Sequence, residues 1–195
     1  MPPASGPKSE GGPAVLIDPL ADGLSLEPLY DLFRHTATVK VFHAARQDLE
    51  IFFHDAGVFP DPLFDTQIAA MVAGFGEQVG YETLVRRIAR HNLDKSSRFT
   101  DWSRRPLSDS QLTYALGDVT HLAALYPKLR DRLEKDGRLD WVTSEMEDLV
   151  DPALYDTDPN NAWKRLKPKK FNAKYLAAFK ATAVWRERAA QVANV

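Results

Sequence analysis

Cysteine is absent from this 195-residue sequence. Its absence excludes a disulfide framework, a zinc site made of thiolates and a catalytic thiol. The sequence also lacks the run of about 18 apolar residues that a membrane-spanning helix requires. Residues 1–13 lack the apolar core of a secretory signal. We therefore expect a cytoplasmic protein with no membrane partner.

The composition is that of a globular protein with an uneven charge. Hydrophobic residues make up 44% of the sequence and charged residues 27%, which excludes a wholly disordered chain. Residues 1–150 carry 16 basic and 23 acidic side chains, whereas residues 151–195 carry 9 basic and 4 acidic ones. The net charge of −2 conceals this asymmetry. The basic end suits either a solvated helix face or a polyanion contact.

The apolar pattern predicts strands early in the chain and helices later. Short apolar runs predict strands at 14–17, 39–42 and 62–66, the first of them buried. Helical spacing, Ser108 as an N-cap, and Gly57 and Gly137 after helix ends predict the helices. These are expected from about residue 25, over 46–56, 68–72, 81–91, 109–135 and 139–149, around 162–166, and from 172 onward. This order indicates an α/β domain followed by a helical appendage.

Tyr114 and Asp118 form the first pair of residues that could carry out catalysis or bind a metal. They lie four residues apart in the expected helix 109–135, so their side chains share a face. A carboxylate can hold Mg²⁺ or Mn²⁺, and a phenol can orient a metal-bound water. The same pair also suits a half-buried aromatic beside a surface carboxylate.

Asp48 is the second candidate. It lies in the first turn after the expected strand 39–42, at the end of the sheet where open α/β proteins bind ligands. A carboxylate at this position also suits plain helix capping, because acidic residues favour the first turn.

The segments around these residues follow a characteristic order. F-H-A-x-x-x-D-L occupies 42–49, P-L-F-D-T-Q occupies 62–67, W-x-x-R-P-L-S occupies 102–108 and Q-L-x-Y-A-x-x-D-V occupies 111–119. Together they resemble ribonuclease D, in the tyrosine-containing branch of the DEDD exonuclease superfamily, over about residues 15–149. The tail, with Trp163, Arg165 and Trp185, resembles the linker and first helix of an HRDC domain.

The resemblance implies the ribonuclease H-like α/β fold and a 3′–5′ exoribonuclease activity. Asp48 and Asp118 then correspond to the metal-binding aspartates of the second and third motifs, and Tyr114 to the tyrosine that positions the attacking water. The family holds two divalent ions, Mg²⁺ or Mn²⁺, with four carboxylates. The implied partner is RNA with a free 3′ end, such as a tRNA precursor, and we expect a monomer.

One family motif is absent. No D-x-E occurs between residues 1 and 40. The family carries its first two carboxylates in this motif, on a first strand that lies upstream of the strands matched here, so we expect a fold that lacks its first strands. Asp48-Leu49-Glu50 cannot replace it, because residues i and i+2 of a helix do not share a face. We therefore expect a chain cut at both ends and incompetent as a nuclease by itself. Its expected parts are a flexible segment at 1–13, an incomplete exonuclease domain at 14–150, a linker at 151–170 and the first helix of an HRDC-like domain at 171–195.

The segment 85–105 is the expected nucleic-acid contact. It carries seven basic and two acidic side chains and leads into the helix of Tyr114. Cations beside a metal site suit a phosphodiester substrate, because phosphate contacts dominate affinity. Each cation also suits a solvated surface, and the tryptophan suits a structural turn. The candidate RNA-binding residues are Lys95, Arg98, Arg104 and Arg105, with Trp102 as a stacking residue.

Two other functions fit the same residues. One is an RNA-binding fragment without catalysis, which uses the basic segment and the basic tail. The other is a DNA-directed 3′–5′ exonuclease of the same fold. Metal dependence distinguishes the first alternative, and competition between RNA and DNA tails distinguishes the second.

Overall fold

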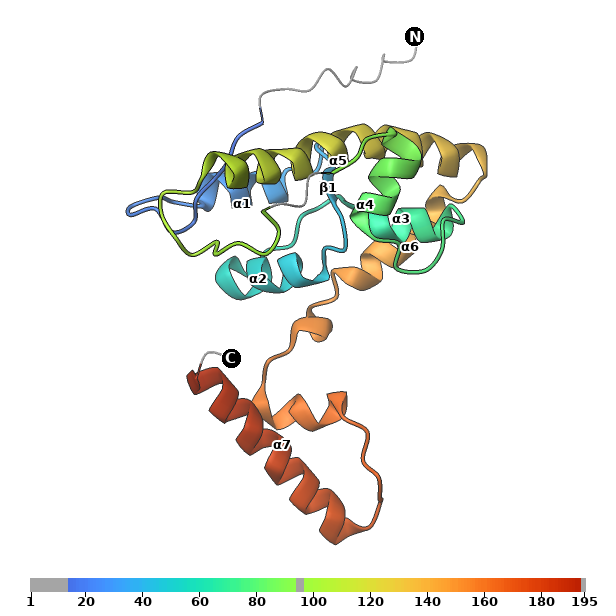
Figure 1. Cartoon of the computed structure of the whole chain (residues 1–195). Coiled ribbons are helices and arrows are strands. Elements are labelled where there is room, and N and C mark those ends of the chain that lie inside the picture. Colours follow the sequence, from blue (N-terminus) through green and yellow to red (C-terminus); the bar gives the residue numbers. More distant parts are fainter. Residues whose placement is uncertain (1–13, 94–96, 194–195) are drawn as a thin grey trace. The chain divides into compact units, whose positions relative to one another are not determined.

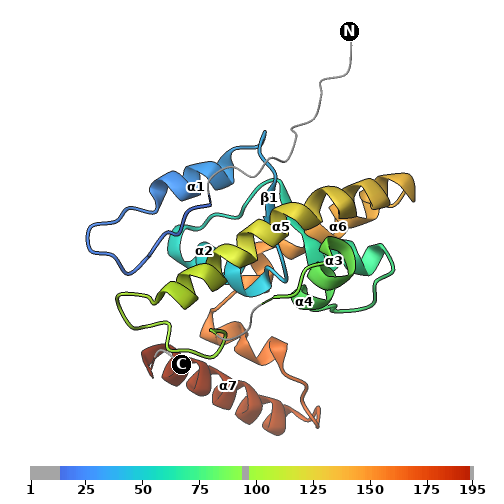
Figure 2. The same cartoon turned by 45° about the horizontal axis from the view of Figure 1, so that its top comes forward.

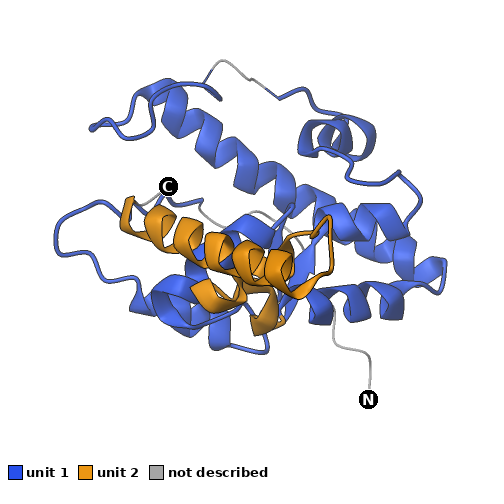
Figure 3. Ribbon diagram, turned by 90° about the horizontal axis from the view of Figure 1, so that it is seen from below, with its two compact units in different colours: residues 1–150 blue, residues 151–195 orange. Residues whose placement is uncertain are grey.

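The computed structural model of the chain describes residues 14–93 and 97–193. The flexible segment predicted at 1–13 and the candidate residue Lys95 lie outside these ranges. The chain divides into two compact units, residues 1–150 and residues 151–195 (Figure 3). Each unit is described by itself below.

Two short parallel strands lie at the centre of the first unit. Strand β1 (Lys40–Phe42) pairs with β2 (Leu63–Asp65), and Phe42 stands opposite Asp65 at their carboxyl ends. Helix α2 (Arg46–Ala56) connects them, as expected for a parallel crossover. It ends at Gly57, whose φ of +63° lies in the left-handed region. The predicted strands at 39–42 and 62–66 and the predicted helix 46–56 are confirmed.

The predicted strand at 14–17 is wrong. These residues have no regular secondary structure and are exposed, with Val15 71% accessible to solvent. A strand needs a neighbour to satisfy its backbone groups, and in the described ranges β1 and β2 pair only with each other. The apolar composition of residues 14–17 is therefore not enough to predict a strand, because no strand in the described ranges pairs with this segment.

Most of the first unit is helical (Figure 1). The long helix α5 (Asp109–Lys135) packs against β1, and Figure 2 shows it crossing in front of this strand. The predicted helices are confirmed except at 81–91, where one α-helical turn continues as a π-helical turn. The elements are α1 (Glu27–Arg34), α3 (Thr66–Val72), α4 (Tyr81–Leu84), the π-helix η1 (Val85–Ala89), α5 (Asp109–Lys135) and α6 (Leu139–Leu149).

A capping box fixes the start of α5. The hydroxyl of Ser108 accepts a hydrogen bond from the backbone N–H of Gln111 at 3.3 Å, and the Gln111 side chain accepts one from the Ser108 N–H at 3.0 Å. Two N–H groups at the helix end are thereby satisfied. The predicted N-cap is confirmed. Because it fixes where α5 begins, it helps to determine which side chains of α5 lie on each face.

Two apolar clusters hold the first unit together. Leu125, Leu129 and Leu133 of α5 are fully buried against residues of α3, α4 and α6. On the other side of β1, the ring of Phe33 lies 4.8 Å from that of Phe52 and 6.3 Å from that of Phe42 in edge-to-face contacts. The strand pair is thus fixed by packing from helices, although it contributes few ladder bonds itself.

The second unit contains two 3₁₀ helices and one long α-helix. These are η2 (Pro152–Tyr155), η3 (Pro159–Arg165) and α7 (Ala173–Ala193). Element η3 packs on α7 through an ion pair of Arg165 with Glu187 at 2.8 Å, and the Lys180 ammonium lies 4.0 Å from the Trp163 ring centre. The short helix predicted at 162–166 begins three residues earlier. No helix within the described ranges is long and apolar enough to cross a bilayer.

Candidate active site

The buried carboxylate of Asp65 organises the carboxyl ends of both strands. It accepts hydrogen bonds from the N–H groups of Ala44 at 3.1 Å, Ala45 at 2.7 Å and Gln67 at 2.7 Å. Ala44 has a φ of +56°, which is unusual for a residue with a side chain. Asp65 therefore caps α3 and holds the sharp turn from β1 into α2 at the same time.

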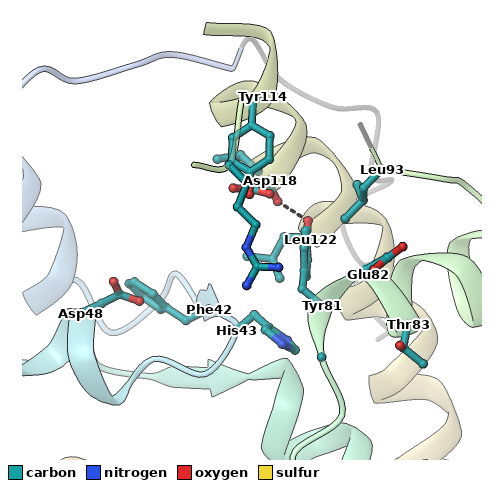
Figure 4. A pocket seen from close by; sticks show the side chains of 13 residues that line it. Phe42, His43, Asp48, Tyr81, Glu82, Thr83, Leu93, Tyr114, Asp118 and Leu122 are labelled. Carbon is teal, nitrogen blue, oxygen red and sulfur yellow. Dashed lines mark hydrogen bonds between the residues drawn. The ribbon is translucent and has the colours of Figure 1, made fainter. Parts of the chain in front are cut away.

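This turn opens onto a cavity of about 510 Å³ (Figure 4). Asp48 approaches it from α2, while Tyr114 and Asp118 project from α5. The three residues that the sequence predicts for catalysis therefore line one cavity. Its other lining residues are Phe42, His43, Gly80, Tyr81, Glu82, Thr83, Leu93, Arg98, Val119 and Leu122.

Tyr81 anchors the part of α5 that carries the carboxylate. Its hydroxyl donates a hydrogen bond to the backbone carbonyl of Asp118. Burial, together with the negative charge of Asp118, raises the pKa of Tyr81 well above its usual value, so the hydroxyl stays protonated and remains a donor. The backbone of Asp118 is thus held from α4 as well as from its own helix.

The cavity disfavours negative charge on both aspartates. Burial raises the pKa of Asp118, and the charge of His121 opposes this rise. Desolvation at the cavity wall raises the pKa of Asp48, although its side chain remains open to solvent, and the nearby Asp65 carboxylate adds to the rise. A cation between these carboxylates would remove this electrostatic cost.

Tyr114 stays neutral beside Asp118. Burial and the Asp118 charge raise the pKa of the phenol, whereas Arg98 lowers it. A protonated phenol can both donate and accept a hydrogen bond. The centres of the Trp102 indole and the Tyr114 ring lie 5.9 Å apart, in a tilted contact.

His43 lines the cavity as a neutral imidazole with its proton on Nδ1. Its Nδ1 lies 3.0 Å from the hydroxyl of Thr66, which donates to the carbonyl of Phe42 at 2.9 Å. The hydroxyl proton is used on that carbonyl, so Nδ1 must carry the donor proton of the imidazole. Burial lowers the pKa of His43, which keeps the ring neutral near pH 7.

The predicted RNA-binding residues separate into two groups. Arg98 lines the cavity, and Trp102 lies behind Tyr114. Arg104 is exposed outside the cavity lining, with its Nε 3.8 Å from the Asp101 carboxylate. Arg105 forms a two-pronged ion pair with Asp18 at 2.5 and 2.6 Å and also donates to the carbonyls of Trp102 and Arg104.

The cavity supplies oxygen ligands of the type that a divalent ion prefers. Carboxylate oxygens are preferred ligands of Mg²⁺ and Mn²⁺, and Asp48 and Asp118 face the same cavity. Within residues 14–93 and 97–193, however, no three His, Asp or Glu side chains gather closely enough to enclose an ion. Water would therefore have to complete the coordination shell.

Sequence reasoning missed Tyr81 and the role of His43. The sequence predicts Tyr81 only as the start of a helix, and its hydrogen bond joins residues 37 positions apart. Gly80 before it, with an extended backbone, marks a helix start but gives no sign of what the side chain reaches. His43 follows strand β1 in the sequence, and its partner Thr66 cannot be identified without the register of the two strands.

Comparisons with known proteins agree on one family. A family model described as a 3′–5′ exonuclease matches residues 8–134. Ribonuclease D of Jannaschia sp. is 60% identical over 189 residues, which cover 97% of this chain and 49% of that protein. The chain spans about half the length of the curated relatives that it matches.

Solved structures give the same picture. Escherichia coli RNase D, described as an exoribonuclease involved in structured RNA processing, matches with a TM-score of 0.77 and 31% identity over 88% of this chain and 46% of its own. Brucella melitensis NrnC with bound Mg²⁺ matches with a TM-score of 0.59 and 28% identity over 74% of this chain and 69% of its own. The predicted resemblance to ribonuclease D and the predicted α/β exonuclease fold are confirmed.

Removing the Asp65 carboxylate should destabilise the fold around the site. Asp65→Ala leaves the buried N–H of Ala45 and the part-buried N–H groups of Ala44 and Gln67 without their acceptor, so we expect the free energy of unfolding to fall by about 2–4 kcal/mol. Urea denaturation followed by circular dichroism measures this loss. Asp22→Ala, in an exposed turn, is the matched control, and an equal effect of both substitutions would contradict the structural role of Asp65.

Removing the charge of Asp118 should increase the free energy of unfolding, in contrast to the decrease expected for Asp65→Ala. Because the folded pKa of Asp118 is raised, the folded state binds more protons than the unfolded state as pH increases from about 3.8, so its contribution to stability declines there. Asp118→Asn abolishes this decline. We expect the variant to be more stable than the parent at pH 7 and equal to it well below pH 3.8, measured by urea denaturation across this range. A parent more stable than the variant at pH 7 would refute the raised pKa.

Proposed function

Since this chain belongs to the 3′–5′ exonuclease family, we propose that it takes part in the hydrolysis of phosphodiesters at RNA 3′ ends, in the manner of a ribonuclease D. The observation that carries the proposal is the convergence of Asp48, Tyr114 and Asp118 on one cavity. They come from two helices, and Arg98 stands beside them.

In this proposal each side chain has a separate role. Asp48 and Asp118 hold a divalent cation, Mg²⁺ or Mn²⁺, which when bound neutralises charge on the scissile phosphate and activates water. Tyr114 orients the attacking water through its protonated hydroxyl. Arg98 attracts the phosphate backbone, and the neutral His43 completes the wall of the cavity without adding charge.

Two relatives support the choice of metal and substrate. NrnC of Brucella melitensis has been solved with Mg²⁺ and also bound to pGG, and E. coli RNase D is described as acting in structured RNA processing. By similarity we propose Mg²⁺ as the preferred ion and RNA with a free 3′ end as the substrate. A tRNA precursor is the substrate that the resemblance to ribonuclease D implies.

The same resemblance suggests how the chain is organised. We propose that residues 14–150 belong to an exonuclease domain, residues 151–170 to a linker and residues 171–195 to the first helix of an HRDC-like domain. The division of the chain after residue 150 supports this arrangement. A cytoplasmic location and a monomeric state remain part of the same proposal.

An RNA-binding function without catalysis is the second candidate. It is favoured by the lack, within the described ranges, of any cluster of three metal-binding side chains. Binding would then depend on Arg98, Arg104 and the basic tail, and would be independent of Asp48 and Asp118. The two candidates therefore differ in their response to a divalent cation.

Binding of a 5′-labelled RNA with an unpaired 3′ tail separates these candidates. We expect Ca²⁺, which occupies carboxylate sites, to strengthen binding several-fold over EDTA in the parent chain and not in Asp48→Asn or Asp118→Asn. Asp22→Asn should behave like the parent. Equal binding in Ca²⁺ and EDTA, unaffected by either aspartate, would establish the metal-independent alternative, and a DNA tail that competes as well as RNA would indicate a DNA-directed enzyme.

Mononucleotide release from the same RNA in Mg²⁺ or Mn²⁺ tests catalysis. Because the chain offers only Asp48 and Asp118 of the four metal-binding carboxylates that the resemblance implies, we expect the 195-residue chain to release no more product than Asp118→Ala. Robust release that disappears in Asp118→Ala would overturn this expectation and would show that these residues suffice for hydrolysis.

A further inference from the structure

Phe99 is 91% exposed, more than any other large hydrophobic side chain in the described ranges. It occupies a corner of a tight turn, in which the N–H and the hydroxyl of Thr100 both donate to the carbonyl of Ser97, at 3.3 and 2.7 Å. Ser97 is buried, with 2% of its surface accessible. The turn therefore holds Phe99 out into solvent on a fixed base.

The turn is also tied to the catalytic helix. The side-chain amide of Gln111 donates to the hydroxyl of Thr100 and to the carbonyl of Asp101, both at 3.1 Å. Gln111 is buried in the first turn of α5, one turn before Tyr114. The turn backbone that carries Phe99 thus has a defined position relative to the residues that line the cavity, which reduces the entropy that must be lost on binding.

Arg98, the neighbouring turn residue, connects Phe99 to the cavity. Its guanidinium carbon lies 5.2 Å from the centre of the Phe99 ring, and the same side chain lines the cavity beside Tyr114 and Asp118. A guanidinium that lies over an aromatic ring still has N–H donors along its edge, which suit a phosphate. One face of the ring meets the cation, and the other face is open to a flat ligand.

We propose that Phe99 is a stacking platform for an unpaired nucleobase of the 3′ tail, with Arg98 contacting the adjoining phosphate. The proposal rests on the proposed function, because the cavity that it flanks must receive the tail. Every base has a π-face, so such a platform accepts any sequence. Trp102, the stacking residue expected from the sequence, is half-buried against Tyr114 and offers less free surface.

The test measures binding of two RNA tails to the whole chain in Ca²⁺. One tail is oligoadenylate, and the other has the same length and phosphates but abasic sugars. We expect Phe99→Ala and Phe99→Leu to weaken binding of the oligoadenylate tail by about tenfold or more and to leave the abasic tail unchanged. Phe99→Trp should restore the parent affinity. Leucine preserves an apolar side chain without a π-face, so the comparison isolates stacking, and Ile51→Ala, at another exposed apolar position, is the control.

Each other outcome is decisive. Unchanged affinity of Phe99→Leu for oligoadenylate overturns the platform while leaving the proposed function intact. Equal weakening for both tails also overturns it, because the loss would then concern phosphates or folding, which thermal denaturation of the variants checks. If the parent binds neither tail, both the platform and the proposed function fail.

Discussion

The buried carboxylate of Asp65 is the interaction on which the site depends. Two parallel strands of three residues cannot by themselves fix the loops that follow them, because they share few hydrogen bonds. Asp65 supplies further hydrogen bonds at this point. Its carboxylate accepts them from backbone N–H groups at the start of α2 and at the start of α3. The position of Asp48, one turn into α2, follows from this bond. A carboxylate close to the candidate metal ligands thus has a structural role and is not available as a ligand itself.

Helix α5 is the second fixed part of the site, and it is held from outside along its first turns. Gln111 ties its start to the turn that presents Arg98 and Phe99, and Tyr81 bonds to its backbone at Asp118. These contacts come from different elements, so the helix cannot rotate without breaking several of them. Tyr114, which lies between them, is thereby presented to the cavity in one orientation, with Trp102 behind it.

The sequence predicted those parts of the fold that local chemistry determines. The capping box at Ser108 and the left-handed Gly57 depend on a few neighbouring residues, so the limits of α5 and α2 could be predicted closely. The segment 14–17 was wrongly predicted, because a strand depends on a partner that composition does not reveal. The π-helical turn at 85–89, which packs against α5, is likewise not distinguished from a regular helix by its apolar spacing.

The same distinction applies to the site. Asp48, Tyr114 and Asp118 could be proposed because motif spacing specifies them, whereas the contributions of Tyr81, His43 and Phe99 depend on partners far along the chain or on exposure. Arg105 shows the limit of counting charges. Its guanidinium is already matched by the Asp18 carboxylate, 87 positions away, and by two carbonyls. The protein thus carries an internal substitute for phosphate at this point. A polyanion that approaches the segment 85–105 meets a weaker positive field there than the residue count indicates, and it must displace an intramolecular competitor before it gains that guanidinium.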